Sequence, residues 1–186
     1  MGKFNFIETG IEGMLLIEPT VFGDERGYFM ETYNEGEFDA AGHAWRFVQD
    51  NESRSRRGVL RGLHMQVKHP QGKLVRAIEG EVFDVGVDLR KGSATFGKWF
   101  GAVLSRENKR QLFIPEGFAH GFCVLSEDAS FVYKCTSLYD PSDELGVKFD
   151  DPDIGIEWPG CGVDFILSDK DKAQPSFKEV KKILRV

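Results

Sequence analysis

The sequence predicts an all-β fold, a barrel or sandwich of short strands. Sixteen Phe and 21 Gly among 186 residues suit many strands joined by tight turns. Runs with β-like composition recur between turn signals, whereas segments with helical periodicity are scarce. With 41% hydrophobic residues, a chain of this length buries one good core, so we expect a single domain over residues 1–186.

About nine strands are expected from the short apolar runs. They span residues 14–18, 28–33, 45–49, 58–66, 73–79, 81–89, 98–104, 111–115 and 129–139. The runs 73–79 and 81–89 meet at Gly80, which predicts a tight hairpin because glycine adopts positive φ freely. Along 81–89, alternation places Val82, Asp84, Gly86 and Asp88 on one unusually polar face.

Two short helices are expected. Asn34 caps a helix over residues 35–41, and the capping-box spacing of Ser176 and Glu179 starts a second over 176–184. Residues 140–159 are rich in Asp, Pro and Gly and predict an ordered, irregular excursion from the barrel. Arg56 and Arg57 are interpreted as part of a solvated loop.

Charge and cysteine content narrow the function classes. The net charge of −6 gives no global positive field for a nucleic acid or an anionic membrane, so we expect neither partner. No apolar run approaches the length of a membrane span. Three cysteines without paired spacing favour reduced thiols and a cytoplasmic location, and predict neither a disulfide framework nor a zinc knuckle.

Two of the four histidines occupy suggestive settings. His64 closes the string Gly-Val-Leu-Arg-Gly-Leu-His, and His120 ends Pro-Glu-Gly-Phe-Ala-His, which resembles the second half-motif of cupins. The first half-motif of metal-binding cupins supplies a second His, but here Gln66 stands in that place. Metal-free chemistry is therefore expected, with imidazole as a general base because its ordinary pKa lies near neutrality.

Other polar side chains lie in compatible positions. Lys73 begins a strand, and Tyr133 and Tyr139 share one face of the run 129–139. Structural interpretations also exist: a solvated strand end for Lys73, core aromatics for the tyrosines and a hydrogen-bonded core residue for a lone His. Arg61 and His64 should point to opposite faces of a regular strand, unless Gly62 forms a bulge that turns both inward.

Taken together, these strings resemble the dTDP-4-dehydrorhamnose 3,5-epimerase family of dimeric cupin-fold enzymes. The resemblance spans nearly the whole chain. It is carried by residues 22–31, 47–51, 58–64, 71–76, 114–122, 131–136, 139–141 with Glu144, 156–159 and 167–171. It implies a cupin-type double-stranded β-helix (jelly-roll) barrel with a few short helices.

The resemblance also implies roles for individual residues. His64 is the base, oriented by Asp171 or, as the alternative, Asp169; Tyr133 is the proton donor on the opposite face of the sugar, and Lys73 lies beside the C4 carbonyl oxygen. The residues implied to hold the nucleotide sugar are Arg26, Glu31, Gln49, Asn51, Arg61, His120, Tyr139, Glu144 and Lys170. The stretch 26–31 reaches a site on the partner subunit in the family, which implies a homodimer with shared sites.

The implied activity inverts C3 and C5 of dTDP-4-dehydro-6-deoxy-D-glucose through enolate intermediates, giving dTDP-4-dehydro-L-rhamnose without a metal or other cofactor. Related dTDP-4-keto-sugar enzymes that epimerise only C3 or C5, or that shift the ketone between C3 and C4, remain alternatives. Tyr133 argues against an enzyme acting at C3 alone. A non-catalytic cupin that binds a sugar is a further alternative, which the co-occurrence of His64, Lys73, Tyr133 and Asp171 disfavours.

Overall fold

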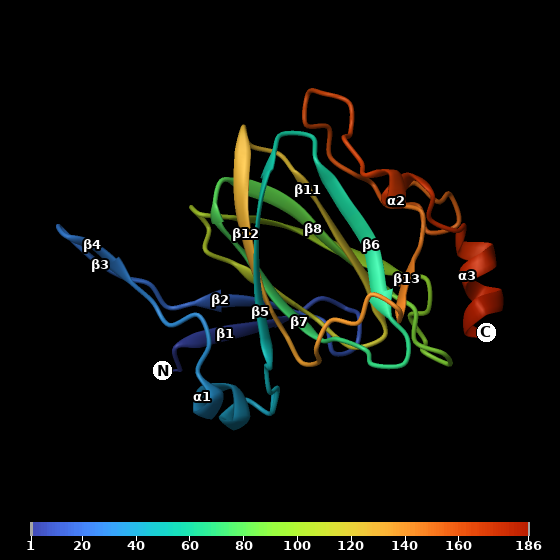
Figure 1. The fold of residues 1–186 in the computed structure, drawn as a ribbon. Helices are drawn as coiled ribbons and strands as arrows, with labels where there is room; N and C mark the ends of the chain where they lie inside the picture. The colour runs from blue at the N-terminus through green and yellow to red at the C-terminus, as the bar shows by residue number, and fades with distance from the viewer. Residues whose placement is uncertain (1, 186) are drawn as a thin grey trace.

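Two antiparallel sheets face each other in the computed structural model, which describes residues 2–185 (Figure 1). In spatial order, the six-stranded sheet contains β1 (Phe4–Glu8), β2 (Leu15–Pro19), β10 (Gln111–Ile114), β7 (Lys73–Glu79), β12 (Asp128–Cys135) and β5 (Gln49–Arg56). The five-stranded sheet contains β13 (Glu144–Gly146), β6 (Leu60–Gln66), β11 (Phe118–Val124), β8 (Glu81–Asp88) and β9 (Trp99–Ser105). A separate hairpin is formed by β3 (Phe22–Asp24) and β4 (Gly27–Phe29).

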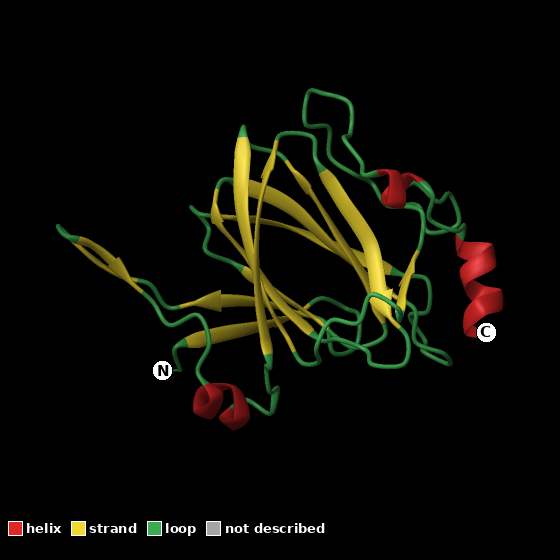
Figure 2. Ribbon diagram, viewed as in Figure 1, coloured by secondary structure: helices red, strands yellow, loops and turns green. Residues whose placement is uncertain are grey.

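From β5 onward, the chain passes repeatedly from one sheet to the other. This alternation winds the strands into a jelly-roll barrel, so the expected all-β, cupin-like fold is confirmed. Few residues are helical, and the helices lie at the periphery (Figure 2).

The hairpin predicted at Gly80 is wrong. β7 pairs with β10 and β12, whereas β8 pairs with β11 and β9 in the opposite sheet. Gly80 has φ +68° and packs so tightly that an added Cβ would lie 2.0 Å from the carbonyl oxygen of Asp128. A glycine with positive φ is compatible both with a hairpin turn and with a connection that crosses from one sheet to the other. The strands with which β7 and β8 pair decide which of the two forms.

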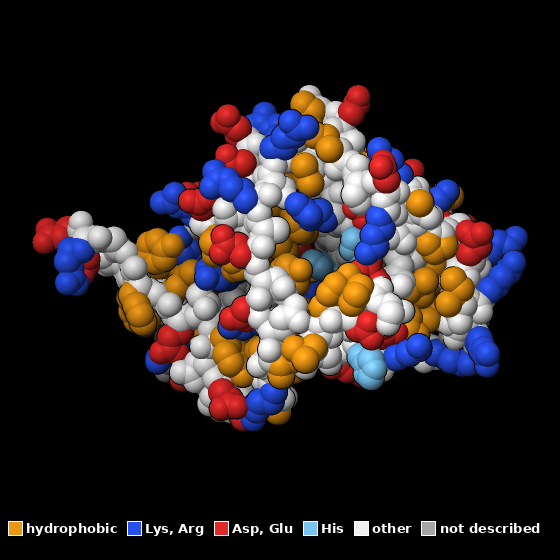
Figure 3. Space-filling view, viewed as in Figure 1, with side chains coloured by type: hydrophobic (Ala, Val, Ile, Leu, Met, Phe, Trp, Pro, Cys, Tyr) orange, Lys and Arg blue, Asp and Glu red, His pale blue; other side chains and the backbone are white. Residues whose placement is uncertain are grey.

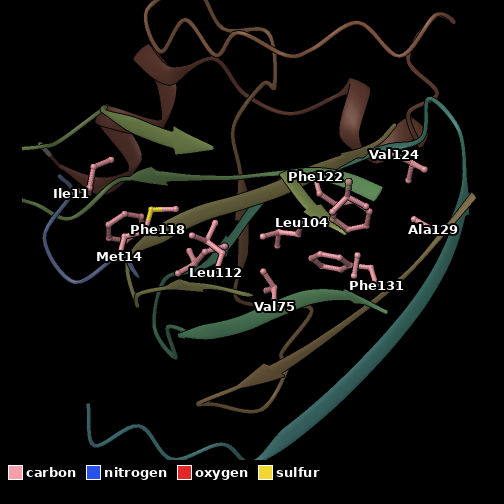
Figure 4. Close-up of a cluster of buried hydrophobic side chains, with 13 residues drawn as sticks. Ile11, Met14, Val75, Leu104, Leu112, Phe118, Phe122, Val124, Ala129 and Phe131 are labelled. Atoms are coloured by element: carbon pink, nitrogen blue, oxygen red, sulfur yellow. The ribbon is translucent and has the colours of Figure 1, made fainter. Parts of the chain in front are cut away.

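The main core lies between the two sheets (Figure 4). Val75, Leu112 and Phe131 from the six-stranded sheet pack with Leu104 and Phe122 from the five-stranded one. This apolar cluster fills only part of the barrel interior, and polar side chains line the rest.

Two smaller clusters cover the outer faces of the sheets. Val85, Val87 and Leu63 pack beneath Phe177 and Val180 of helix α3 (Phe177–Leu184). On the other sheet, Leu74 and Phe113 pack with Phe38 of helix α1 (Glu35–Ala40). The alternation along β8 follows from this arrangement, since Val82 packs in the main core while Val85 and Val87 face α3.

The helix signals are confirmed. The side chain of Asn34 caps α1, and Ser176 and Glu179 form the predicted capping box at the start of α3. A third helix, α2 (Asp169–Lys172), was not predicted because it has only four residues. Ser168 is its N-cap, and the Ser168 side chain accepts a hydrogen bond from the backbone N–H of Asp171.

Several strand boundaries differ from the prediction. Residues 45–48 are irregular, and β5 begins only at Gln49 and continues to Arg56, so Arg56 is exposed on a strand rather than in a loop. The strands that were missed are β1, β3, β5, β11 and β13. Residues of β11 are buried on both faces, which removes the alternation that reveals a strand, and β5 is polar throughout.

Candidate active site

A cavity of about 700 Å³ opens between the two sheets. On the face of the molecule drawn in the space-filling view, histidine side chains lie inside a hollow (Figure 3). The residues predicted for the site that line the cavity are Gln49, Asn51, Arg61, His64, Lys73, His120, Tyr133, Tyr139, Glu144, Lys170 and Asp171. They come from both sheets, from α2 and, for Tyr139, from the segment after β12, so only the closed barrel brings them together.

A bulge in β6 allows Arg61 and His64 to face the same cavity, as the position of Gly62 suggested. His64 pairs with His120, Arg61 pairs with Phe122, and the register shifts between these pairs. Gly62 has φ +122°, and a Cβ there would lie 2.6 Å from Cα of the neighbouring strand's Gly121. The close approach of the two backbones at this point therefore requires glycine.

His64 is held by a carboxylate. Its Nε2 lies 2.6 Å from Oδ1 of Asp171, which is only 5% exposed. Asp169, the alternative partner, is exposed on α2 and lies 3.4 Å from the Lys172 ammonium. Burial lowers the pKa of His64, while the carboxylates of Glu144 and Asp171 oppose that shift. The imidazole is therefore neutral over a wider pH range than in water.

Lys73 and Tyr133 lie on the opposite wall, in the six-stranded sheet. Cys135 of β12 is the register partner of Lys73, and Tyr133 lies two residues away on the same face. Burial lowers the pKa of the Lys73 ammonium, against the influence of Cys135 and nearby carboxylates, and burial raises the pKa of the Tyr133 phenol. Lys73 thus lines a cavity rather than ending as a solvated strand terminus.

Tyr133 and Tyr139 both line the cavity, but they do not share a strand. β12 ends at Cys135, and Tyr139 follows in an irregular segment. There, the backbone N–H of Tyr139 donates to Oε1 of Gln49 at 2.9 Å, and Nε2 of Gln49 donates to Oδ1 of Asn51 at 2.9 Å. The two amide side chains therefore hold the segment that carries the tyrosine.

Glu144 is surrounded by the charged and polar groups of the site. Its carboxylate lies 2.5 Å from Nζ of Lys170, accepts a hydrogen bond from the Tyr139 hydroxyl at 2.9 Å, and lies 3.8 Å from Nε2 of His64. Burial alone would raise the pKa of Glu144, but Lys170 and its other partners lower it. The same carboxylate also acts on the pKa values of Lys73 and Tyr133, so groups from both walls gather around one negative charge.

A second imidazole–carboxylate pair lies deeper in the barrel. His120 Nε2 lies 2.9 Å from Oδ2 of Asp84, whose side chain is fully buried. Oδ1 of Asp84 has no hydrogen-bond partner among the residues that the structure describes, and burial raises the pKa of this carboxyl despite His120 and Lys73 nearby. The polar face predicted for β8 is thus explained at Asp84, which points into the barrel.

Arg26 and Glu31 are the predicted residues that do not line this cavity. Arg26 lies in the β3–β4 hairpin, 85% exposed and paired with Asp24 at 2.5 Å. Glu31 pairs instead with the Lys3 ammonium. The hairpin that carries Arg26 extends away from the barrel (Figure 1), and neither Arg26 nor Glu31 lines the cavity that contains His64.

Ser168 also lines the cavity and was not predicted as a site residue. Its Ser-x-x-Asp spacing with Asp171 is an N-cap signature, which could have identified it in the sequence. Within residues 2–185, no group of three or more His, Cys, Asp or Glu side chains is arranged to hold a metal ion. Across the same residues, no helix is both long and apolar enough to cross a membrane.

An imidazole paired with a carboxylate on one wall, facing an ammonium and a phenol on the other, is suited to proton transfer. The protein is therefore a cupin-like jelly roll with a cavity suited to acid–base chemistry. The family model for dTDP-4-dehydrorhamnose 3,5-epimerase matches residues 8–179. The chain belongs to this family.

Individual relatives agree with this assignment. A dTDP-4-dehydrorhamnose 3,5-epimerase from Methanothermobacter thermautotrophicus is 58% identical over 180 residues, covering 96% of this chain and 97% of the relative. The structure of an epimerase from Legionella pneumophila in complex with dTDP-4-keto-L-rhamnose has a TM-score of 0.93 and 50% identity, covering 97% of this chain and 96% of that one.

The same fold also carries a narrower activity. ChmJ, a 3′-monoepimerase from Streptomyces bikiniensis in complex with dTDP-quinovose, has a TM-score of 0.89 and 35% identity, covering 95% of this chain and 90% of that one. Overall shape therefore does not separate double from single epimerisation.

Proposed function

We propose that the chain acts as a single domain that epimerises C3 and C5 of dTDP-4-dehydro-6-deoxy-D-glucose, yielding dTDP-4-dehydro-L-rhamnose. The observation that carries this proposal is the facing arrangement of His64 on one wall and Tyr133 and Lys73 on the other. Membership of the epimerase family supports the substrate. Inversion neither oxidises nor reduces the sugar, so the reaction requires no redox cofactor.

His64 removes the proton next to the C4 ketone. Because Nε2 is engaged with Asp171, Nδ1 is the ring nitrogen left to accept that proton. If the carbon acid is about a dozen pKa units weaker than imidazolium, the transfer costs ~16 kcal/mol. A hydrogen-bond donor at the developing oxyanion contributes about 3–4 kcal/mol, and the Lys73 ammonium is the group proposed for this role.

Tyr133 returns a proton to the opposite face of the enolate. A base that returned the proton to the face from which it came would achieve no inversion, so a second group is required. Burial raises the pKa of Tyr133, which keeps the phenol protonated and able to donate. After one inversion, Tyr133 is a phenolate and His64 an imidazolium, and exchange with solvent restores both.

The nucleotide diphosphate requires cations, and the site offers Arg61 and Lys170. Arg26 is a third cation for the diphosphate, supplied by a second copy of the chain. The exposed aromatic residues of its hairpin, Phe22, Tyr28 and Phe29, support a homodimer in which the hairpin of one subunit packs on its partner.

The activity is tested by NMR of dTDP-4-dehydro-6-deoxy-D-glucose in heavy water. We expect deuterium incorporation and inversion at both C3 and C5. Exchange confined to one carbon would identify a monoepimerase, and no exchange would indicate a binding protein. Tyr133→Phe should retain deuterium wash-in while losing most inversion, because the base remains but the opposite donor is gone; unchanged inversion would remove Tyr133 from the mechanism.

Shared sites are tested by mixing two impaired variants, Arg26→Ala and His64→Ala. In a mixed dimer, one site carries both defects and the other carries neither. Unfolding and refolding equal amounts of the two variants makes about half of the dimers mixed, so activity should return to about a quarter of wild type. Light scattering should report a dimer for each variant. A monomer, or a mixture that stays inactive, would contradict shared sites.

A further inference from the structure

We propose that Ser168 is a positioning residue, which fixes the Asp171 carboxylate against His64 and thereby sets the orientation of the base. The hydroxyl of Ser168 donates to Oδ2 of Asp171 at 2.7 Å, while Oδ1 of the same carboxylate lies 2.6 Å from Nε2 of His64. The two oxygens of Asp171 are therefore engaged on opposite sides. This inference rests on the proposed acid–base function.

The local backbone gives Ser168 this reach. Ser168 is the N-cap of α2, with extended φ and ψ of −67° and 160°, and its Oγ accepts the backbone N–H of Asp171 at 3.1 Å. Its hydroxyl proton remains free to donate to the Asp171 carboxylate. One side chain thus holds both the backbone and the carboxylate of Asp171.

No other side chain described in residues 2–185 hydrogen-bonds to Oδ2. Lys170 of the same helix reaches Glu144 at 2.5 Å, and Lys172 lies near Asp169 at 3.4 Å. Asp171 is 5% exposed, so losing the Ser168 hydroxyl leaves a largely buried oxygen without a protein donor. The carboxylate then gains freedom to rotate, which loosens the imidazole that it orients.

The expected change in the pH dependence of activity follows from the groups that face His64. These are Asp171 and Lys170 from α2, Glu144 from β13 and His120 in register on β11. Asp171 favours the imidazolium, whereas burial and Lys170 disfavour it. A carboxylate that has rotated away stabilises imidazolium less, so the acid limb of activity moves to lower pH.

Ser168→Gly and Ser168→Thr separate this role from simple helix capping. Glycine is tolerated at an N-cap nearly as well as serine but has no hydroxyl, whereas threonine keeps the hydroxyl. For the glycine variant, we expect kcat to fall about three- to tenfold, with KM nearly unchanged. The acid limb of kcat/KM should move to lower pH, and the threonine variant should restore both.

Three outcomes would overturn the inference. An unchanged kcat and pH profile in the glycine variant would show that the hydroxyl has no role. A rise in KM at constant kcat would make Ser168 a substrate contact, and a lower melting temperature without a shifted pH profile would make it only a cap. The proposed function is tested separately, because it fails if the wild-type protein shows no deuterium exchange. Even in that case, the ring ¹⁵N chemical shifts of His64 should differ between the wild-type protein and the glycine variant if Ser168 positions Asp171.

Discussion

Replacing Asp171 by Asn tests how the base is held. The carboxylate accepts from Ser168 at Oδ2 and faces Nε2 of His64 at Oδ1. If the amide introduced by Asp171→Asn keeps its oxygen toward the Ser168 hydroxyl, its NH₂ group points at Nε2 of the imidazole. That nitrogen must then be the acceptor, which moves the imidazole proton to Nδ1 and blocks the atom that should receive the substrate proton.

The magnitude follows from these contacts. Losing a hydrogen bond to a charged group costs about 1.5–3 kcal/mol, which lowers the rate roughly 10- to 150-fold. The wrong tautomer in a comparable imidazole–carboxylate pair costs ~10⁴ in kcat. We therefore expect kcat of the Asp171→Asn variant to fall by at least about tenfold, and by up to ~10⁴ if the tautomer changes.

The assay follows deuterium exchange and inversion of the keto sugar by NMR. Asp169→Asn is the matched control, because it removes the same charge from the same helix at an exposed position that does not line the cavity. It should keep kcat within about twofold of wild type. Near-normal turnover in the Asp171→Asn variant, or equal losses in both variants, would refute the assigned role of Asp171.

Four further outcomes are expected. Lys73→Met should lower kcat about 10²- to 10³-fold, because the proposed oxyanion donor is lost. Urea unfolding should show unchanged or greater stability, since a thioether replaces a buried ammonium. Lower stability together with normal kcat would contradict this. Gly62→Ala should destabilise the fold by about 2–4 kcal/mol in a urea titration, because residue 62 has positive φ and packs closely against Gly121. Gly10→Ala is the control: residue 10 also has positive φ but faces open space, so this variant should cost only about 1 kcal/mol. The acid limb of kcat/KM should lie below pH ~6.5, because the base must be neutral and burial lowers the pKa of His64; a limb above that value would argue against His64. Extended dialysis against a chelator should leave turnover unchanged, and a loss that added metal restores would disprove metal-free catalysis.

Local physics in the sequence determined much of the fold. Turn glycines and short apolar runs defined the all-β class, and the spacings at Asn34 and Ser176 located two helix starts, because capping depends on only a few neighbouring residues. The glycine between Arg61 and His64 indicated a bulge, which the register shift in β6 confirms. Of the candidate site residues that the family strings supplied, all but Arg26 and Glu31 line one cavity.

Tertiary structure decided what depends on distant partners. Gly80 permits a hairpin and a crossing equally well, and only the pairing of β7 and β8 in opposite sheets selects the crossing. β11 escaped prediction because burial on both faces erases its alternation. Whether Asp169 or Asp171 meets His64 depends on how α2 packs against β6, since both aspartates lie in the same short helix. Sequence patterns record local preference and which faces avoid water, whereas the distance between His64 and a carboxylate 107 positions away is fixed only when the barrel closes.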